Sequence, residues 1–216
     1  MDLTERIYLY CERGGPDLWA EPVNALTNLA FLLGAWIMWR RSEGGAVRLL
    51  SAELAAIGLA SLVFHLTALA WAGALDSLTI AIFALTYLYL ANRHFVGLGP
   101  ALSAVGAALS VPLTVALVPV FETIPWIAIS AEYWTLPVLF ALYGLGLIWR
   151  LPGVGLGLLG AGALLSVSIL VRSADRLLCP RWALGTHFGW HLLNALLLTG
   201  LIWLLQRHLA RRTGGR

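Results

Sequence analysis

The chain has 216 residues, of which 60% are hydrophobic and only 12% are charged. Soluble domains are typically about 45–50% apolar and about 25% charged, so this composition argues against a water-soluble protein and favours one embedded in a membrane. All fourteen basic residues are arginines, and the small net charge of +3 is spread over loops. Because no basic stripe with interleaved aromatic residues is present, nucleic acid is not an expected partner.

Seven stretches are long and apolar enough to be membrane-spanning helices, since a helix needs roughly 20 apolar residues to cross the hydrocarbon core. In chain order these stretches are 22–40, 47–67, 74–93, 100–119, 131–149, 153–171 and 184–206. Residues 1–21 form an acidic segment outside the membrane, and they lack the basic start and apolar run of a signal peptide. The sequence therefore predicts an all-α integral membrane protein, with a seven-helix domain over 22–206 and a basic cytoplasmic tail over 207–216.

The arginines near the ends of the spans predict the orientation of the bundle. They are more numerous around the first, third and fifth loops and the C-terminal tail than around the N-terminal segment and the even-numbered loops. Cytoplasmic loops carry the excess of basic residues, so the N-terminus is expected outside and the C-terminus in the cytoplasm. The absence of lysine and the short loops suggest a bacterial chain, whose membrane would be the inner (cell) membrane.

Four ionisable residues inside the predicted spans lie at one depth. His65 is near the outer end of the second span, Asp76 near the outer start of the third, and His187 and His191 in the first two turns of the seventh. An ionisable group in a bilayer is costly, so such groups usually face a cavity and carry function. The alternating topology therefore predicts that these four side chains meet near the outer face.

Three of the four residues have the pattern of a zinc site. His187 and His191 are four residues apart, so they share a helix face, and His65 supplies a third imidazole. Three histidines are a common zinc set that leaves the fourth position open to water. Asp76 could then accept a proton from that water, and Ser61, one turn before His65, could donate to an oxyanion.

Each of these residues also has a purely structural interpretation. A single histidine in a membrane helix is often a packed residue bonded to a neighbour. Asp76 could only cap the start of its helix, and the Ser61 hydroxyl could bond back to the preceding turn.

The combined pattern resembles the alkaline ceramidase family, which belongs to a superfamily of seven-span hydrolases that includes adiponectin-receptor-like proteins. The N-terminal stretch from Tyr10 to Asn28 is similar to the W-C-E…E-x2-N…N segment of that family, and the resemblance extends from about residue 8 to about residue 206. The other matching motifs are S-x3-H ending at His65, Asp76 at the start of the third span, and H-x3-H from His187 to His191.

This resemblance implies a zinc-dependent amidase that hydrolyses ceramide or a related N-acyl lipid to a fatty acid and an amine. It implies His65, His187 and His191 as zinc ligands and Ser61 and Asp76 as catalytic residues. A non-enzymatic, metal-dependent lipid-binding or receptor-like protein of the same fold is the alternative. A metal or proton transporter is less consistent with the sequence, because the polar groups are concentrated in the outer half of the spans. The exact lipid and the oligomeric state do not follow from the sequence.

The resemblance also implies a calcium site in the N-terminal segment. Its candidate ligands are the carboxylates of Glu12, Asp17 and Glu21 and the backbone carbonyl of Tyr10. Two family positions differ: the aspartate expected just before the aromatic-Cys pair is absent, since Tyr8 and Leu9 occupy those places, and Gly14 stands where an asparagine is expected. Calcium prefers six to eight oxygens, so calcium binding and its absence both stay open.

The family pattern also pairs the two cysteines, Cys11 and Cys179, in a disulfide that would tie the acidic segment over the site. The alternative is a pair of free thiols, and an oxidising compartment would permit the bond. In the sixth loop, Arg172, Asp175 and Arg176 are expected to form a solvent-exposed network.

Overall fold

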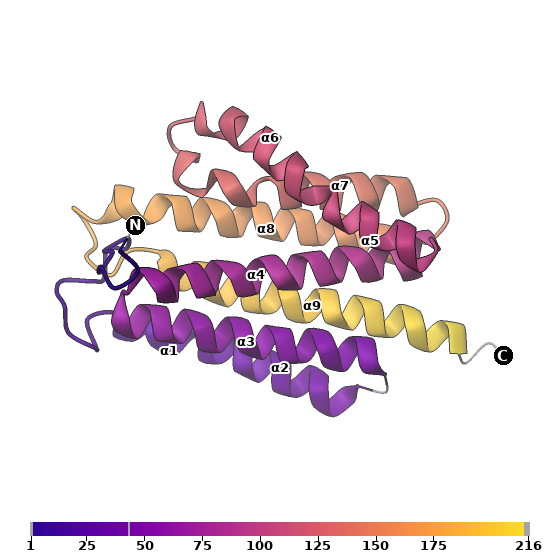
Figure 1. The fold of residues 1–216 in the computed structure, drawn as a ribbon, viewed down its shortest axis with the longest axis horizontal. Helices are drawn as coiled ribbons and strands as arrows, with labels where there is room; N and C mark the ends of the chain where they lie inside the picture. The colour runs from indigo at the N-terminus through magenta and orange to yellow at the C-terminus, as the bar shows by residue number, and fades with distance from the viewer. Residues whose placement is uncertain (1, 43, 214–216) are drawn as a thin grey trace.

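The computed structural model describes residues 2–42 and 44–213, and over these residues the protein is a helical bundle without β-strands. Figure 1 shows the helices packed side by side, with the N-terminal segment at one end of the bundle and the C-terminus at the other. The elements are α1 (Pro22–Thr27), α2 (Leu29–Arg41), α3 (Gly45–Thr67), α4 (Ala70–Ala91), η1 (Asn92–Val96), α5 (Pro100–Ala108), α6 (Ser110–Glu122), η2 (Ala128–Tyr133), α7 (Thr135–Leu147), α8 (Pro152–Leu178) and α9 (His187–Thr213).

Among the described residues, six helical stretches are long and apolar enough to cross a membrane. They are Pro22–Arg41, Gly45–Thr67, Ala70–Val96, Pro100–Glu122, Pro152–Leu178 and His187–Arg212. The all-helical prediction is confirmed, but the predicted fifth span at 131–149 is only partly regular helix. The α7 helix has 13 residues and covers about 20 Å, short of a hydrocarbon core of about 30 Å.

Several helices extend beyond their predicted ends. The α4 helix begins at Ala70 rather than 74, and α8 continues to Leu178 rather than 171. The α9 helix reaches Thr213, so most of the predicted tail over 207–216 is a continuation of this helix. The last three residues of the predicted tail lie outside the described residues. Helices continue past the apolar stretch because their backbone hydrogen bonds are satisfied internally, in water as in lipid.

The α9 helix connects the two halves of the bundle, since it contacts α1, α2 and α3 on one side and α8 on the other. Small residues permit close approach: a Cβ built on Gly34 of α2 would lie 2.1 Å from the Thr199 hydroxyl oxygen of α9. The central core includes Phe31, Leu54 and Ile202, all almost fully buried. This packing places the start of α9 beside the end of α3.

A two-residue turn brings α4 back directly after α3. Ala68 adopts a left-handed conformation with φ of 54°, and α4 starts two residues later. The N-terminal segment pairs with this turn through backbone bonds from Ile7 N–H to Ala68 O (2.8 Å) and from Ala70 N–H to Glu5 O (2.9 Å). The end of α3, the start of α4 and the N-terminal segment therefore share one end of the bundle.

Candidate metal centre

The three predicted histidines meet inside the bundle. His65 comes from the last turn of α3, and His187 and His191 come from the first two turns of α9. All three are at most 2% exposed, and each offers a ligand atom within 4.8 Å of the others. Their ring centroids lie 4.5 to 5.1 Å apart. The expected convergence of His65, His187 and His191 is thus present in the structure.

The unpaired ring nitrogens show that this cluster fits a metal ion. His65 Nε2 and His187 Nδ1 are buried and have no hydrogen-bond partner among the described residues. The Nδ1 atom of His191 lies 2.9 Å from the Thr27 hydroxyl, which leaves its other ring nitrogen available. An unsatisfied buried polar atom is costly, and coordination by neutral imidazoles would satisfy these atoms. The donor set suits zinc, copper, iron or nickel.

Glu21 is a partner of His65 that the sequence did not suggest. Its Oε2 atom lies 2.7 Å from His65 Nδ1 and accepts a hydrogen bond from Asn24 Nδ2 at 3.1 Å. Its Oε1 atom accepts from the Arg13 guanidinium. Burial alone would raise the pKa of Glu21, but the hydrogen bonds from His65, Arg13 and Asn24 hold it below its ordinary value. A carboxylate on the far nitrogen fixes the tautomer and orientation of a ligating histidine.

Of the other residues considered for calcium, Glu12 is also held within the protein. Both carboxylate oxygens of Glu12 accept backbone N–H groups at the start of α1, from Val23 at 2.7 Å and Asn24 at 2.8 Å. The Asp17 side chain is exposed. The Tyr10 ring stacks on His187 with centroids 3.4 Å apart. Of the candidate calcium ligands Tyr10, Glu12, Asp17 and Glu21, therefore, Glu12 and Glu21 have carboxylates that are already hydrogen-bonded within the protein.

Ser61 and Asp76 lie beside the histidines. Ser61 is 3% exposed, and both residues line a cavity together with His191. The Oδ1 atom of Asp76 is buried and has no hydrogen-bond partner among the described residues. Because Leu69 is the residue that precedes α4 and Asp76 lies in its second turn, Asp76 does not act as a helix cap.

The cavity extends from this polar end into the apolar interior. Ser61, Asp76, His191 and Asn194 supply its polar wall. The residues of α4 from Asp76 to Leu88 line it along one face, which corresponds to about 18 Å of helix. Its remaining walls include the apolar side chains of Phe83, Phe140, Leu165, Leu197 and Leu201. The cavity is therefore polar at one end and apolar along its length.

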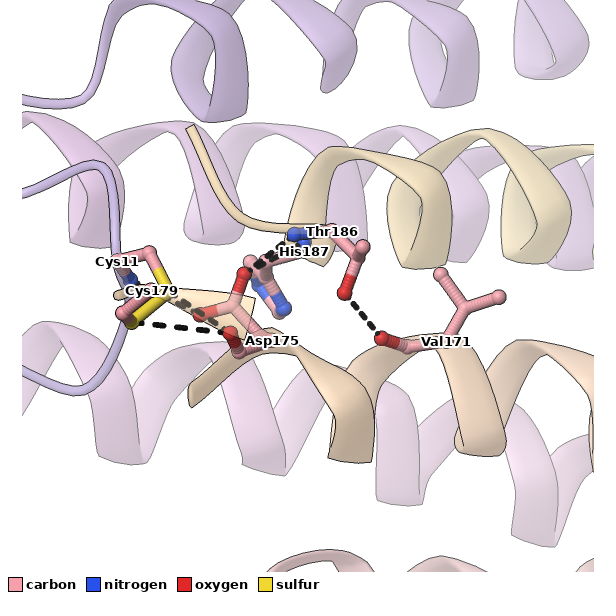
Figure 2. Close-up of a disulfide and its surroundings, with 6 residues drawn as sticks. All are labelled: Cys11, Val171, Asp175, Cys179, Thr186 and His187. Atoms are coloured by element: carbon pink, nitrogen blue, oxygen red, sulfur yellow. Dashed lines mark hydrogen bonds between the residues drawn. A yellow bond between two sulfur atoms is a disulfide. The ribbon is translucent and has the colours of Figure 1, made fainter. Parts of the chain in front are cut away.

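Asp175 accepts hydrogen bonds from the backbone at the start of α9 (Figure 2). Its Oδ1 atom accepts the backbone N–H groups of Thr186 at 2.6 Å and His187 at 2.9 Å, and its Oδ2 atom accepts that of Cys11 at 2.9 Å. Cys11 and Cys179 lie at disulfide distance beside it, with sulfurs 1.92 Å apart. These contacts anchor both the N-terminal segment and His187.

The expectation of a solvent-exposed network in the sixth loop is wrong for two of its three residues. Asp175 is only 1% exposed. The Arg172 guanidinium lies over the rings of Tyr133 and Trp190, at 5.1 and 5.7 Å from their centroids. Both residues belong to α8, which is longer than predicted, so they face the interior of the bundle and only Arg176 is exposed.

Six membrane-length helices and a buried three-histidine group define the class, a multi-pass helical membrane protein with a candidate metal centre. The sequence profile of the Ceramidase family matches residues 10–152, about two thirds of the chain. The protein therefore belongs to the Ceramidase family, which confirms the resemblance and implies a hydrolase that acts on amide bonds. The matched region includes Ser61, His65 and Asp76, whereas His187 and His191 lie beyond it. No curated protein matches the chain.

Proposed function

We propose that the protein is a zinc-dependent, membrane-embedded amidase that hydrolyses the N-acyl bond of ceramide or a related N-acyl lipid to a fatty acid and an amine. One observation carries this proposal: in a member of the Ceramidase family, three buried histidines form a cluster, and one of them, His191, lies at the polar end of an otherwise apolar cavity. The apolar walls would contact the acyl chain, and His191 would lie near its amide.

His65, His187 and His191 would hold the zinc ion. When bound by three imidazoles, zinc lowers the pKa of a coordinated water to about 7 and polarises a carbonyl group. Asp76 would accept a proton from the attacking water and pass it to the leaving amine. Ser61 would donate a hydrogen bond to the developing oxyanion, an interaction worth roughly 3–4 kcal/mol in known oxyanion holes.

The proposed membrane setting follows from the position of the site in the bundle. The N-terminal segment, the end of α3 and the start of α9 lie together, and the C-terminus lies at the opposite end (Figure 1). With seven crossings, the N-terminus outside and the C-terminus in the cytoplasm, the site would lie near the outer face of a bacterial inner membrane. Residues 1–21 would be the extramembrane segment and 22–206 the hydrolase domain, with membrane lipids as neighbours.

The test is turnover of a fluorescent ceramide, and of a panel of other N-acyl lipids, by the zinc-loaded protein in detergent. We expect hydrolysis by the wild type and its loss in His191→Ala. Asp76→Asn should lower kcat by about 10²–10⁴-fold and Ser61→Ala by about 10²–10³-fold. His94→Ala, in η1 beyond the other end of α4, should hydrolyse the substrate at the wild-type rate. Zinc retention with no turnover across the panel would instead indicate the lipid-binding or receptor-like protein.

A further inference from the structure

Arg13 is a buried cation in the N-terminal segment. The residue is 7% exposed, and its guanidinium donates hydrogen bonds to four oxygen acceptors. Its Nε donates to Glu21 Oε1, its Nη1 to the carbonyls of Gly15 (3.1 Å) and Asp17 (3.2 Å), and its Nη2 to the carbonyl of His65. A buried charge is tolerated only when it is paired and hydrogen-bonded, and Arg13 meets both conditions.

These four acceptors come from three separate parts of the chain. Gly15 and Asp17 belong to the loop that follows Arg13, Glu21 directly precedes α1, and His65 is in the last turn of α3. One carboxylate and three carbonyls around a single positive charge are the kind of oxygens that a hard metal cation binds. Here the positive charge is supplied by the chain itself.

The same contacts disagree with a calcium ion in this segment. The carboxylate of Glu12 is used by the backbone of α1, and both oxygens of Glu21 are bound by Arg13, His65 and Asn24. A calcium ion needs six to eight oxygens, and one placed on Glu21 would face the guanidinium charge on the same carboxylate. The residues present therefore do not fit calcium.

We propose that the Arg13 guanidinium takes the place of a bound cation, so that the N-terminal segment folds and holds Glu21 against His65 without calcium. Arg13 is then a positioning residue: it holds the Glu21 carboxylate, which orients the His65 ring. The absence of a calcium requirement stands whether or not the protein is an amidase.

The first experiment measures calcium with the purified, zinc-loaded wild type in calcium-free buffer. We expect equilibrium dialysis to show no stoichiometric calcium binding. Thermal unfolding should have the same midpoint with and without saturating calcium, since a ligand stabilises only the state that binds it. About one equivalent of bound calcium, or a clear calcium-dependent rise of the midpoint, would overturn the proposal.

The second experiment removes the internal charge and uses Arg6→Gln, an exposed residue of the same segment, as the matched control. Arg13→Gln leaves the Glu21 carboxylate without the Arg13 cation, so the unfolding midpoint of this variant should fall by roughly 10 °C. Arg13→Lys should restore part of that loss, because lysine keeps the charge but lacks the planar fork of donors. An Arg13→Gln variant that unfolds at the midpoint of Arg6→Gln would contradict the role. If Arg13→Gln cannot be purified, the unfolding midpoint of Arg13→Lys, compared with that of Arg6→Gln, and the calcium measurement still test the proposal.

Discussion

Glu21 links the N-terminal segment to the candidate metal centre because each of its two carboxylate oxygens contacts a different residue. One of its oxygens faces His65 Nδ1 at 2.7 Å, and the other faces the Arg13 guanidinium. This leaves His65 Nε2 as the nitrogen without a partner among the described residues, so the carboxylate selects which nitrogen is offered to a metal.

Glu21→Gln should therefore weaken zinc binding by about 10–100-fold, the usual cost of removing such a partner. Glutamine keeps the shape of the side chain but loses the charge that holds the imidazole and Arg13. Competition titration with a zinc chelator measures the change. Glu5→Gln, which alters an exposed carboxylate of the same segment, serves as the control. Equal zinc affinities in the two variants would show that Glu21 does not orient His65.

The residues of the site were predictable from sequence to different degrees. The depth argument identified His65, Asp76 and the two histidines of α9, because an ionisable group inside an apolar span stands out. Ser61 was identified by its position one turn before His65. Glu21 was predicted only as a possible calcium ligand, since its partner His65 is 44 residues away and its role depends on how α1 meets α3.

At the level of elements, the position of α9 depends on a contact from α8. The first N–H groups of a helix have no partner within the helix, and here Asp175 of α8 accepts those of Thr186 and His187. No local pattern marks Asp175 as this cap, because it lies eleven residues before Thr186 on another helix.

Asp175→Ala should destabilise the protein by about 1–3 kcal/mol, because it leaves buried N–H groups without an acceptor. The substitution should also lower zinc affinity, since the backbone of His187 at the start of α9 would lose the hydrogen bond that positions it. Thermal unfolding and zinc titration measure the two effects. The neighbouring variant Arg176→Ala changes an exposed side chain and should match the wild type in both. A zinc affinity equal to that of the wild type in Asp175→Ala would show that capping by Asp175 does not position His187 for zinc binding.

The short α7 helix is fixed by backbone contact with α8. A Cβ on Gly155 would lie 2.6 Å from Ile148 Cα and 2.8 Å from the Gly144 carbonyl oxygen, and neither backbone atom can move aside easily. A Cβ on Gly160 of the same helix would meet no heavy atom within 4 Å among the described residues.

Gly155→Ala should accordingly destabilise the bundle by about 1–3 kcal/mol. Gly160→Ala should be neutral or stabilising by up to about 1 kcal/mol, because alanine is the better helix former. Thermal unfolding in detergent compares the two variants. Equal midpoints would show that α7 is not packed against α8 as described.

The sequence predicted where the helices are better than where they end. Hydropathy detects only the part of a helix that must avoid water, so the extensions of α4, α8 and α9 were missed. The fifth span was overestimated because its apolar residues are divided between η2 and α7, with non-helical backbone at Ser130.

At the scale of the whole molecule, the termini lie at opposite ends of the bundle (Figure 1). Opposite ends require an odd number of crossings, so we predict that the segment that contains α7 adds a seventh crossing to the six membrane-length helices among the described residues. The excess of arginine at the C-terminal end predicts that this end lies in the cytoplasm.

Reporter fusions test this topology. A green fluorescent protein fused to the C-terminus should fluoresce in the cytoplasm, and an alkaline phosphatase fused to the N-terminus should be active outside. A phosphatase fused to the C-terminus is the matched control and should be inactive. Activity of the phosphatase at both termini would indicate an even number of crossings and contradict the seven-span arrangement.

The most direct test of the proposed metal centre is metal analysis of the purified protein supplied with zinc. The wild type should retain about one zinc per chain, and His65→Ala, His187→Ala and His191→Ala should each lose most of it. His208→Ala, a histidine near the opposite end of α9, should retain it. A wild type that binds no zinc, or three variants that bind as much as the wild type, would contradict a metal centre formed by these histidines.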